Sequence, residues 1–347
     1  MGLYVGKSGK RDVEIDISSL NSHIMLTGLS GSGKSVRMLD IINHASQQGR
    51  TILVFDKDGT GYDIPKSNRI SAINDGLNLN FLGRIDTSSE EKRRLNLMNA
   101  TDLLSAGVHF GGRQRACLRK VIEEAAKNRQ KFPDDMQAIS YFLQSERSSV
   151  ADSVFDALWG VLEGNIFRQG NGCFLKSGNV NVISFAGMNP KLQVQVIEIM
   201  LSAIWHRFRE RGCCGKECLL CIDEMQSLSL KKETVLFELL TEARKYGLSL
   251  LLATQTLDIF NSTEQAVLGQ AAVKVFFRPQ ENDVRKVAKM VDLSNVERTE
   301  MILRNLKKGQ ALTVGNLNVN GHQILSPIIT KSDWGCIERE CQELSNL

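Results

Sequence analysis

The sequence predicts an α/β fold in which a mostly parallel sheet is interrupted by a helical insertion. Short β-branched runs alternate with amphipathic helical patterns over residues 21–84 and again over 179–330. Between them, residues 85–178 contain mainly helical patterns separated by polar turns. With 347 residues, 42% of them hydrophobic, the chain is long enough to bury the core of such a fold.

The first elements along the chain are a hairpin and a crossover unit. Two short alternating runs within residues 1–20 flank a polar turn and predict the hairpin. An apolar run at 23–27 leads through a glycine-rich stretch into a helical pattern at 35–48, and a β-branched run at 51–55 follows. A strand, a helix and a strand this close together predict a βαβ crossover with parallel strands.

The expected insertion contains four helical patterns, at 88–105, 113–130, 136–145 and 149–163. Arginine and lysine are frequent over 113–131. Such a pattern is more often a solvated helix face than a ligand site, although we also consider it a candidate contact for nucleic acid.

Strand and helix patterns alternate again after the insertion. Strands are expected at 179–185, 218–222, 248–253, 273–277, 310–314 and 323–329, and helices at 192–211, 231–245, 281–291 and 296–306. We expect the last two strands at the edge of the sheet. The polar tail at 331–347 predicts no element.

The glycine-rich stretch carries the most specific motif. Residues 28–35 read GLSGSGKS and fit the phosphate-binding P-loop, G-x-x-x-x-G-K-[ST], in its strand–loop–helix context. Its glycines allow backbone N–H groups to face phosphates, Lys34 can reach the β- and γ-phosphates, and the Ser35 hydroxyl can ligate Mg²⁺. The sequence therefore predicts a site for ATP and Mg²⁺. The expected nucleotide-binding residues are Gly28, Ser30, Gly31, Ser32, Gly33, Lys34, Ser35 and Val36.

Two later strands supply candidates for the rest of the site. The apolar run at 219–222 ends in Asp223 and Glu224, as in a Walker B strand, and parallel sheets bind ligands at the carboxyl ends of their strands. We expect Asp223 to hold Mg²⁺ and Glu224 to orient and polarise the attacking water. Gln255, at the end of the next strand, is expected to sense the γ-phosphate. A glutamate directly after the aspartate favours hydrolysis over a kinase reaction.

Several other functions are disfavoured by the sequence. Four cysteines crowd into 213–221, but Cys218 and Cys221 lie in an apolar strand that points them to opposite faces, so we favour core residues in a reducing cytosol over a zinc site. The guanine signature Asn-Lys-x-Asp and the transporter signature Leu-Ser-Gly-Gly-Gln are both absent. No apolar run approaches the roughly 18 residues of a membrane span and no secretory signal is visible, so we expect a cytoplasmic protein without membrane insertion. The net charge of +4 permits nucleic-acid binding without arguing for it.

Four segments in order resemble the HerA–FtsK superfamily of ring-forming, DNA-pumping ATPases. They read SHIMLTGLSGSGKS, TILVFDKDG, LLCIDEMQSL and EARKYGLSLLLATQT, and the closing LKKGQALTV also resembles HerA-like cores. The resemblance implies a RecA-like P-loop core and a hexamer that threads double-stranded DNA without regard to sequence. It also implies that Asp56 supports the metal site and that Arg244 is an arginine finger for the neighbouring subunit. We expect Arg244 near the ligand edge of the sheet, with Arg278 as the next candidate.

The chain also departs from that family's pattern, which leaves its role open. Only about 20 residues precede the P-loop strand, too few for the N-terminal barrel of full HerA proteins, and neither membrane helices nor a winged-helix DNA reader are visible. One alternative is a DNA-packaging ATPase of a virus or mobile element. Another is a nucleotide-gated scaffold that regulates a nuclease or other effector without translocation.

Overall fold

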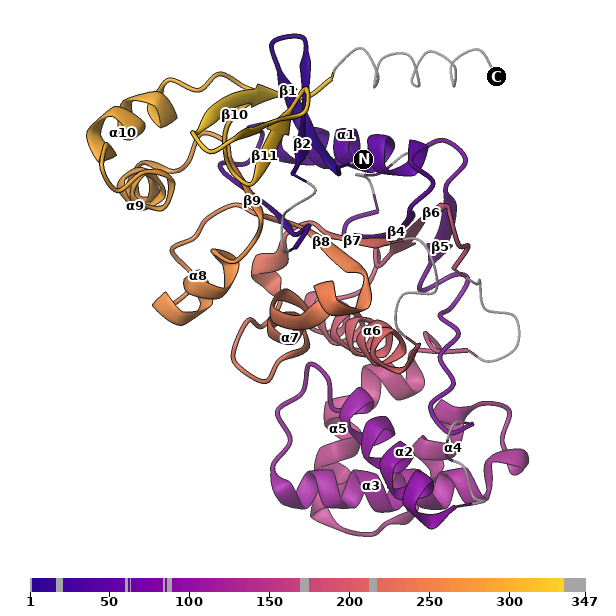
Figure 1. The fold of residues 1–347 in the computed structure, drawn as a ribbon. Coiled ribbons are helices and arrows are strands. Elements are labelled where there is room, and N and C mark those ends of the chain that lie inside the picture. The colour runs from indigo at the N-terminus through magenta and orange to yellow at the C-terminus, as the bar shows by residue number, and fades with distance from the viewer. Residues whose placement is uncertain are drawn as a thin grey trace. The chain divides into compact units, whose positions relative to one another are not determined.

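A computed structural model of the chain describes residues 2–16, 21–59, 62, 64–83, 85, 89–168, 175–211 and 217–333. The chain forms two compact units (Figure 1). The core unit comprises Met1–Arg69, Lys176–Ile183 and Phe208–Leu347, and the helical unit comprises Ile70–Leu175 and Ser184–Arg207. The sequence placed 184–207 in the core, whereas the structure groups Ser184–Arg207 with the helices.

The strands of the described residues form one thirteen-stranded sheet, in the order β12-β11-β2-β1-β13-β10-β9-β3-β8-β7-β4-β6-β5. Their bounds are Tyr4–Ser8 (β1), Arg11–Ile15 (β2), Ile24–Thr27 (β3), Thr51–Asp56 (β4), Asn68–Ser71 (β5), Val180–Ser184 (β6), Cys218–Ile222 (β7), Leu248–Thr254 (β8), Val273–Phe276 (β9), Gln310–Gly315 (β10), Leu317–Val319 (β11), His322–Ile324 (β12) and Ile328–Lys331 (β13).

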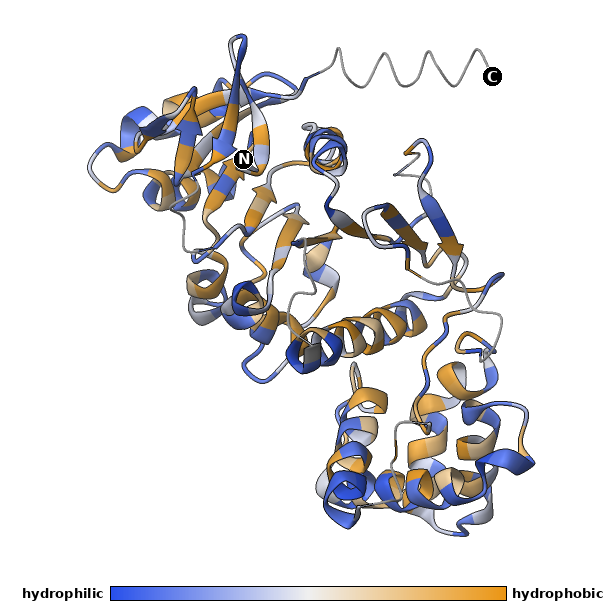
Figure 2. Cartoon of the chain, turned by 45° about the vertical axis from the view of Figure 1, so that its right-hand side comes forward, coloured by the Kyte–Doolittle hydropathy of each residue, from blue (hydrophilic) through white to orange (hydrophobic). Residues whose placement is uncertain are grey.

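The parallel part of the sheet positions the site. Strand β3 pairs in parallel with β8 and β9, and β7 pairs in parallel with β8 and β4. Every residue of β3, β7 and β8 is buried, which explains why these strands read as continuous apolar runs. Because the strands are parallel, their carboxyl ends form one edge. Figure 2 shows hydrophobic residues concentrated on these central strands.

The predicted edge position is wrong for the strand at 310–314, whereas the segment at 323–329 divides into β12, which is the outermost strand, and β13, which lies inside the sheet. Strand β10 lies between β9 and β13, and β13 in turn pairs with β1. The N-terminal hairpin and the β11–β12 hairpin extend the sheet beyond them. This order depends on antiparallel pairing between chain ends about 300 residues apart, for which the local pattern contains no signal.

The helices of the core unit are α1 (Lys34–Gln47), the end of α6 (Pro190–Arg211), α7 (Val235–Glu242), α8 (Ser262–Leu268), α9 (Glu281–Val291) and α10 (Val296–Arg304). Helices α1 and α7 lie on opposite faces of the central strands (Figure 1). Helix α8 was not predicted, although Asn261 and Glu264 form a capping box at its start. The predicted helix at 231–245 ends early and continues as a 3₁₀ turn, Ala243–Tyr246.

The helical unit contains α2 (Glu90–Leu104), α3 (Gly112–Lys127), α4 (Asp135–Ser145), α5 (Ser149–Glu163) and most of α6. The four helices predicted for the insertion are thus present. Ser89, Asp134 and Ser148 cap α2, α4 and α5 by accepting a backbone N–H bond with their side chains. Among the described residues, no helix is both long and apolar enough to cross a membrane.

A buried polar network joins α1 to the N-terminal hairpin and to β13. The fully buried Arg37 guanidinium donates to the Val5 carbonyl at 2.9 Å and to Thr330 Oγ1 at 2.8 Å. Asp40 Oδ2 accepts from the Tyr4 hydroxyl at 2.9 Å. The Arg37 guanidinium also lies 5.7 Å from the centre of the Phe277 ring. The helix that follows the P-loop is therefore fixed by both ends of the chain.

Candidate nucleotide site

A cavity of about 270 Å³ lies in the core unit where β3, β7 and β8 end. It is lined by Ser30, Gly31, Gly33, Lys34, Ser35, Val36, Asp223, Glu224, Thr254, Gln255 and Lys308. The structure thus brings the glycine-rich loop together with the acidic pair after β7 and the glutamine after β8. The parallel register places all three at one edge of the sheet.

Two glycines of the loop have conformations and neighbours that exclude a side chain. Gly28 has a φ of 149°, and an added Cβ would lie 2.6 Å from the Cβ of Phe277. Gly33 has a φ of 112°, and its added Cβ would lie 3.0 Å from the Gly309 Cα. Since α1 begins directly after Gly33 without a side-chain cap, its first N–H groups are available to a phosphate.

Lys34 and Ser35 begin α1 inside this cavity. The Lys34 ammonium donates to the carbonyls of Gly28 at 2.7 Å and Leu29 at 2.9 Å. Burial lowers the pKa of Lys34, while the charges of Asp223 and Glu224 act in the opposite direction. Ser35 Oγ donates to Asp223 Oδ2 at 3.1 Å. This hydroxyl and carboxylate fit Mg²⁺, which takes oxygen ligands and usually keeps several waters.

Asp223 has a second contact that the sequence did not suggest. The Tyr62 hydroxyl donates to Asp223 Oδ2 at 2.7 Å. Burial and the charge of Asp223 raise the pKa of Tyr62, so this phenol stays a donor. A tyrosine several residues after a strand gives no local sign of such a role.

Asp56 is not among the residues that line the cavity, and its expected support of the metal site stays a prediction. Its Oδ1 accepts from the Gly59 N–H at 2.9 Å, and the residue is 3% exposed. Burial raises its pKa. The Asp56 side chain thus accepts a hydrogen bond from the backbone N–H three residues later in its own loop, as aspartates commonly do in turns.

Glu224 is held between the two strands that flank β7. Its Oε1 accepts from Gln255 Nε2 at 3.1 Å, and its Oε2 lies 3.4 Å from the Lys57 ammonium. The backbone of Glu224 is left-handed, with a φ of 54°. A left-handed glutamate is strained, and such strain concentrates at functional sites. The sequence placed Glu224 and Gln255 at the ligand edge separately, without predicting this contact between them, and it missed Lys57.

The loop before β10 forms the remaining wall. Gly309 N donates to the Ser32 carbonyl at 2.8 Å, which places Lys308 beside the P-loop. Lys308 belongs to the LKKGQ segment noted in the sequence, but only the fold brings it to the cavity.

Arg244 lies at the opposite edge of the sheet from the cavity, so its expected position near the ligand edge is wrong. It belongs to the turn Ala243–Tyr246 that enters β8, whereas Gln255 follows the end of β8. Burial and, second, the charge of Arg244 lower the pKa of His23 to about 4. Arg278, by contrast, is close to the P-loop of its own chain, since its carbonyl accepts from Leu29 N at 3.0 Å.

The basic residues of 113–131 are mostly paired with carboxylates of the same unit. The pairs are Arg115 with Asp102 at 2.9 Å, and Lys120 with Glu146, Lys127 with Glu124 and Arg129 with Asp135 at 2.8 Å each. This pattern agrees with a solvated helix face. In the cysteine cluster, Cys213 and Cys214 lie outside the described residues. Within the described ranges, no three His, Cys, Asp or Glu side chains are grouped to hold a metal.

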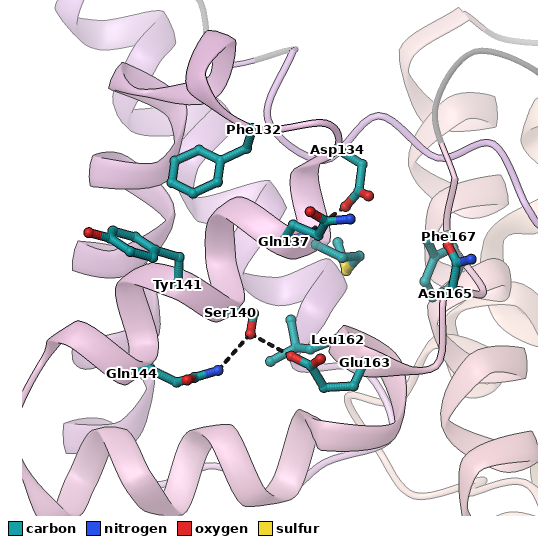
Figure 3. A pocket seen from close by; sticks show the side chains of 11 residues that line it. Phe132, Asp134, Gln137, Ser140, Tyr141, Gln144, Leu162, Glu163, Asn165 and Phe167 are labelled. Atoms are coloured by element: carbon teal, nitrogen blue, oxygen red, sulfur yellow. Dashed lines mark hydrogen bonds between the residues drawn. The ribbon is translucent and has the colours of Figure 1, made fainter.

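A larger cavity of about 570 Å³ lies in the helical unit, between α4 and the segment that follows α5 (Figure 3). Ser140 donates to Glu163 at 2.6 Å and accepts from Gln144 at 3.0 Å. No lysine, arginine or glycine lines this cavity. It therefore lacks the groups that bind phosphates, and the smaller cavity is the candidate nucleotide site.

Comparisons with known proteins agree with this site. A family model described as the type IV secretion-system coupling protein DNA-binding domain matches residues 11–64. No curated protein matches the chain by sequence. The solved structure of VirB4 from Thermoanaerobacter pseudethanolicus aligns with a TM-score of 0.73 and 16% identity, over 98% of each chain.

The plasmid coupling protein TrwB was solved with the non-hydrolysable ATP analogue ADPNP and with ADP and Mg²⁺. Both structures align with a TM-score of 0.65 and 16% identity, over 90% of this chain and 85% of TrwB. The predicted fold is thereby confirmed: the chain has a RecA-like P-loop fold, and the family model over residues 11–64 agrees with the resemblance noted in the sequence.

Proposed function

We propose that this protein is a Mg²⁺-dependent ATPase that moves double-stranded DNA as a ring of identical subunits. The observation that carries the proposal is the cavity in which Glu224 and Gln255 face a P-loop with Lys34 and Ser35. A binding protein without turnover would need the P-loop but would have no need for a carboxylate and an amide in the same cavity.

Each side chain has a defined task in the proposed hydrolysis. Lys34 and the N–H groups at the start of α1 hold the phosphates, and Ser35 and Asp223 would hold Mg²⁺, which neutralises charge on the phosphate oxygens when bound. Glu224 accepts a hydrogen bond from the attacking water and takes its proton, while Gln255 fixes the direction of the carboxylate.

The proposed ring is compatible with the position of Arg244. Strand β8 has seven residues, so about 20 Å separates its start from the cavity at its end. Arg244 therefore cannot serve the site of its own chain, which leaves the site of a neighbouring subunit as the place where it would act. We infer a hexamer in which Arg244 completes the adjacent site.

Double-stranded DNA is the proposed substrate of the motor. A DNA-binding domain model matches residues 11–64, and TrwB is named a conjugative coupling protein. We infer binding that ignores sequence, through phosphate contacts. We place the protein in the cytoplasm, where the buried thiols of Cys218 and Cys221 stay reduced.

The test is the rate of ATP hydrolysis with and without a random duplex, at several salt concentrations, combined with the particle mass. We expect a six-chain particle and DNA-stimulated turnover, with DNA affinity falling steeply as salt rises. Glu224→Gln should remove the turnover. No hydrolysis by the wild type contradicts the ATPase proposal. Hydrolysis that ignores DNA, in a particle that binds none at low salt, would favour the scaffold for an effector such as a nuclease.

A further inference from the structure

We propose that Lys57 is a positioning residue, which holds the carboxylate of Glu224 in the orientation that activates water. This inference rests on the proposed ATPase function, because its effect is on the hydrolytic step. Lys57 directly follows β4, and no residue of this strand lines the cavity.

The strand order explains how Lys57 reaches Glu224. Strand β7 lies between β4 and β8, and Glu224, Lys57 and Gln255 follow the ends of these three strands. The two oxygens of one carboxylate are therefore held from opposite sides. Gln255 contacts Oε1 at 3.1 Å and Lys57 contacts Oε2 at 3.4 Å.

The backbone of Glu224 is fixed by contacts of its own. Its N–H donates to Asp223 Oδ1 at 2.9 Å, and its carbonyl accepts from Ser227 N at 3.1 Å and Ser227 Oγ at 3.0 Å. With the main chain held in place, the freedom that remains is rotation of the side chain. One hydrogen bond from Gln255 permits the carboxylate to pivot, whereas a second contact on the other oxygen prevents it.

Lys57 contacts the Glu224 carboxylate without lining the cavity. Gln255 and Glu224 line the cavity, but Lys57 does not. A direct role for Lys57 in binding phosphate is therefore disfavoured. Each carboxylate oxygen can accept more than one hydrogen bond, so the contact with Lys57 leaves Glu224 able to accept one from water.

A purely structural role would have little measurable consequence. The side chains of Lys57 and Glu224 are 24% and 34% exposed, and ion pairs with such exposure contribute little to stability. A loss of turnover without a loss of stability thus separates positioning from scaffolding.

The experiment compares Lys57→Ala and Lys57→Arg with the wild type. We expect Lys57→Ala to lower kcat by roughly 10- to 100-fold, because small displacements of a reacting group cost about that much. KM and the affinity for ADPNP should stay within about twofold, since Lys57 does not touch the cavity. Lys57→Arg should retain part of the rate, because arginine keeps a positive charge beside Oε2 of Glu224.

Lys7→Ala is the matched control, because Lys7 pairs with Asp333 at 2.6 Å with a similarly exposed side chain of 28%, and Lys7 is not a cavity residue. It should leave kcat unchanged.

Two results would overturn the proposal: an unchanged or faster kcat in Lys57→Ala, or a parallel loss of ADPNP affinity. A wild-type protein that hydrolyses no ATP would instead refute the proposed function. The two failures are thus distinguishable.

Discussion

At the scale of single residues, the site depends on a few short polar contacts at the ends of parallel strands. Lys34 donates to two carbonyls of its own loop, and Ser35 donates to Asp223. These contacts hold the groups in the places where phosphate and Mg²⁺ would be bound. They also give the individual side chains separable roles.

We predict that Lys34→Ala and Glu224→Gln are both inactive but for different reasons. Lys34→Ala removes the cation at the phosphates and should weaken ATP binding as well as turnover. Glu224→Gln keeps the size of the side chain and loses only the base, so ATP should bind and persist. Binding of labelled ATP and single-turnover hydrolysis distinguish them. Near-normal hydrolysis by Glu224→Gln would show that another group is the base.

A second residue-scale prediction concerns His23, which is 1% exposed and accepts from the Leu250 N–H through Nδ1. Its pKa falls from 6.5 to about 4 on folding, mainly because of burial. Between these two values the unfolded chain binds a proton that the folded chain does not. Stability is therefore retained above pH 6.5 and lost as the pH falls towards 4, by roughly 3 kcal/mol at most.

The measurement is urea unfolding of the wild type and His23→Asn at pH 7 and pH 4.5. The asparagine keeps an acceptor for Leu250 N–H but does not titrate. The loss of stability on acidification should be smaller in the variant. Equal losses in both proteins would mean that other groups cause the acid sensitivity.

At the scale of elements, the buried network on α1 explains why the N-terminal hairpin belongs to the core unit. Arg37 and Asp40 lie on a helix that starts at the P-loop, and their partners come from β1 and from residues 330–333. Loss of the network should loosen the attachment of both ends of the chain to this helix.

We predict that Tyr4→Phe lowers the free energy of unfolding by about 1–3 kcal/mol. The substitution removes the hydroxyl that donates to the buried Asp40 carboxylate. This carboxylate is then left with one hydrogen-bond donor fewer. The matched control is Tyr141→Phe, because Tyr141 is 56% exposed and should tolerate the change. Chemical denaturation measures both. Equal stability of the two variants would mean that Asp40 does not depend on this bond.

At the scale of the whole molecule, the position of Arg244 bears on the proposed ring. It enters β8 at the edge opposite the cavity, so any contact with nucleotide must involve another subunit. The alternative is a role at the end of the helical turn, where a basic side chain favours the helix dipole.

We predict that Arg244→Ala binds ATP normally but hydrolyses it roughly 10³- to 10⁵-fold more slowly, as expected for an arginine finger. Lys245→Ala, one residue later in the same turn, is the control and should stay active. Mixed rings of Arg244→Ala and Glu224→Gln contain some interfaces in which both groups are intact. Such mixtures should regain activity. If subunits exchange and no activity returns, the role in the adjacent site is refuted.

The sequence by itself determined the P-loop, the acidic pair after β7, the glutamine after β8 and the four insertion helices. Each of these depends on local spacing, and the rule that parallel strands end at one edge was enough to expect Glu224 and Gln255 at the same edge of the sheet. Local pattern also predicted the βαβ unit from residue types alone.

Only the tertiary structure decided which side chains join the site from distant segments. Tyr62, Lys57 and Lys308 reach it because of strand order and loop packing, and these depend on pairings between residues far apart in the chain. The same long-range pairings placed β10 and β13 inside the sheet. The spacing of residues along the sequence specifies which side chains follow the end of a strand. The order of the strands in the sheet specifies which other side chains they contact.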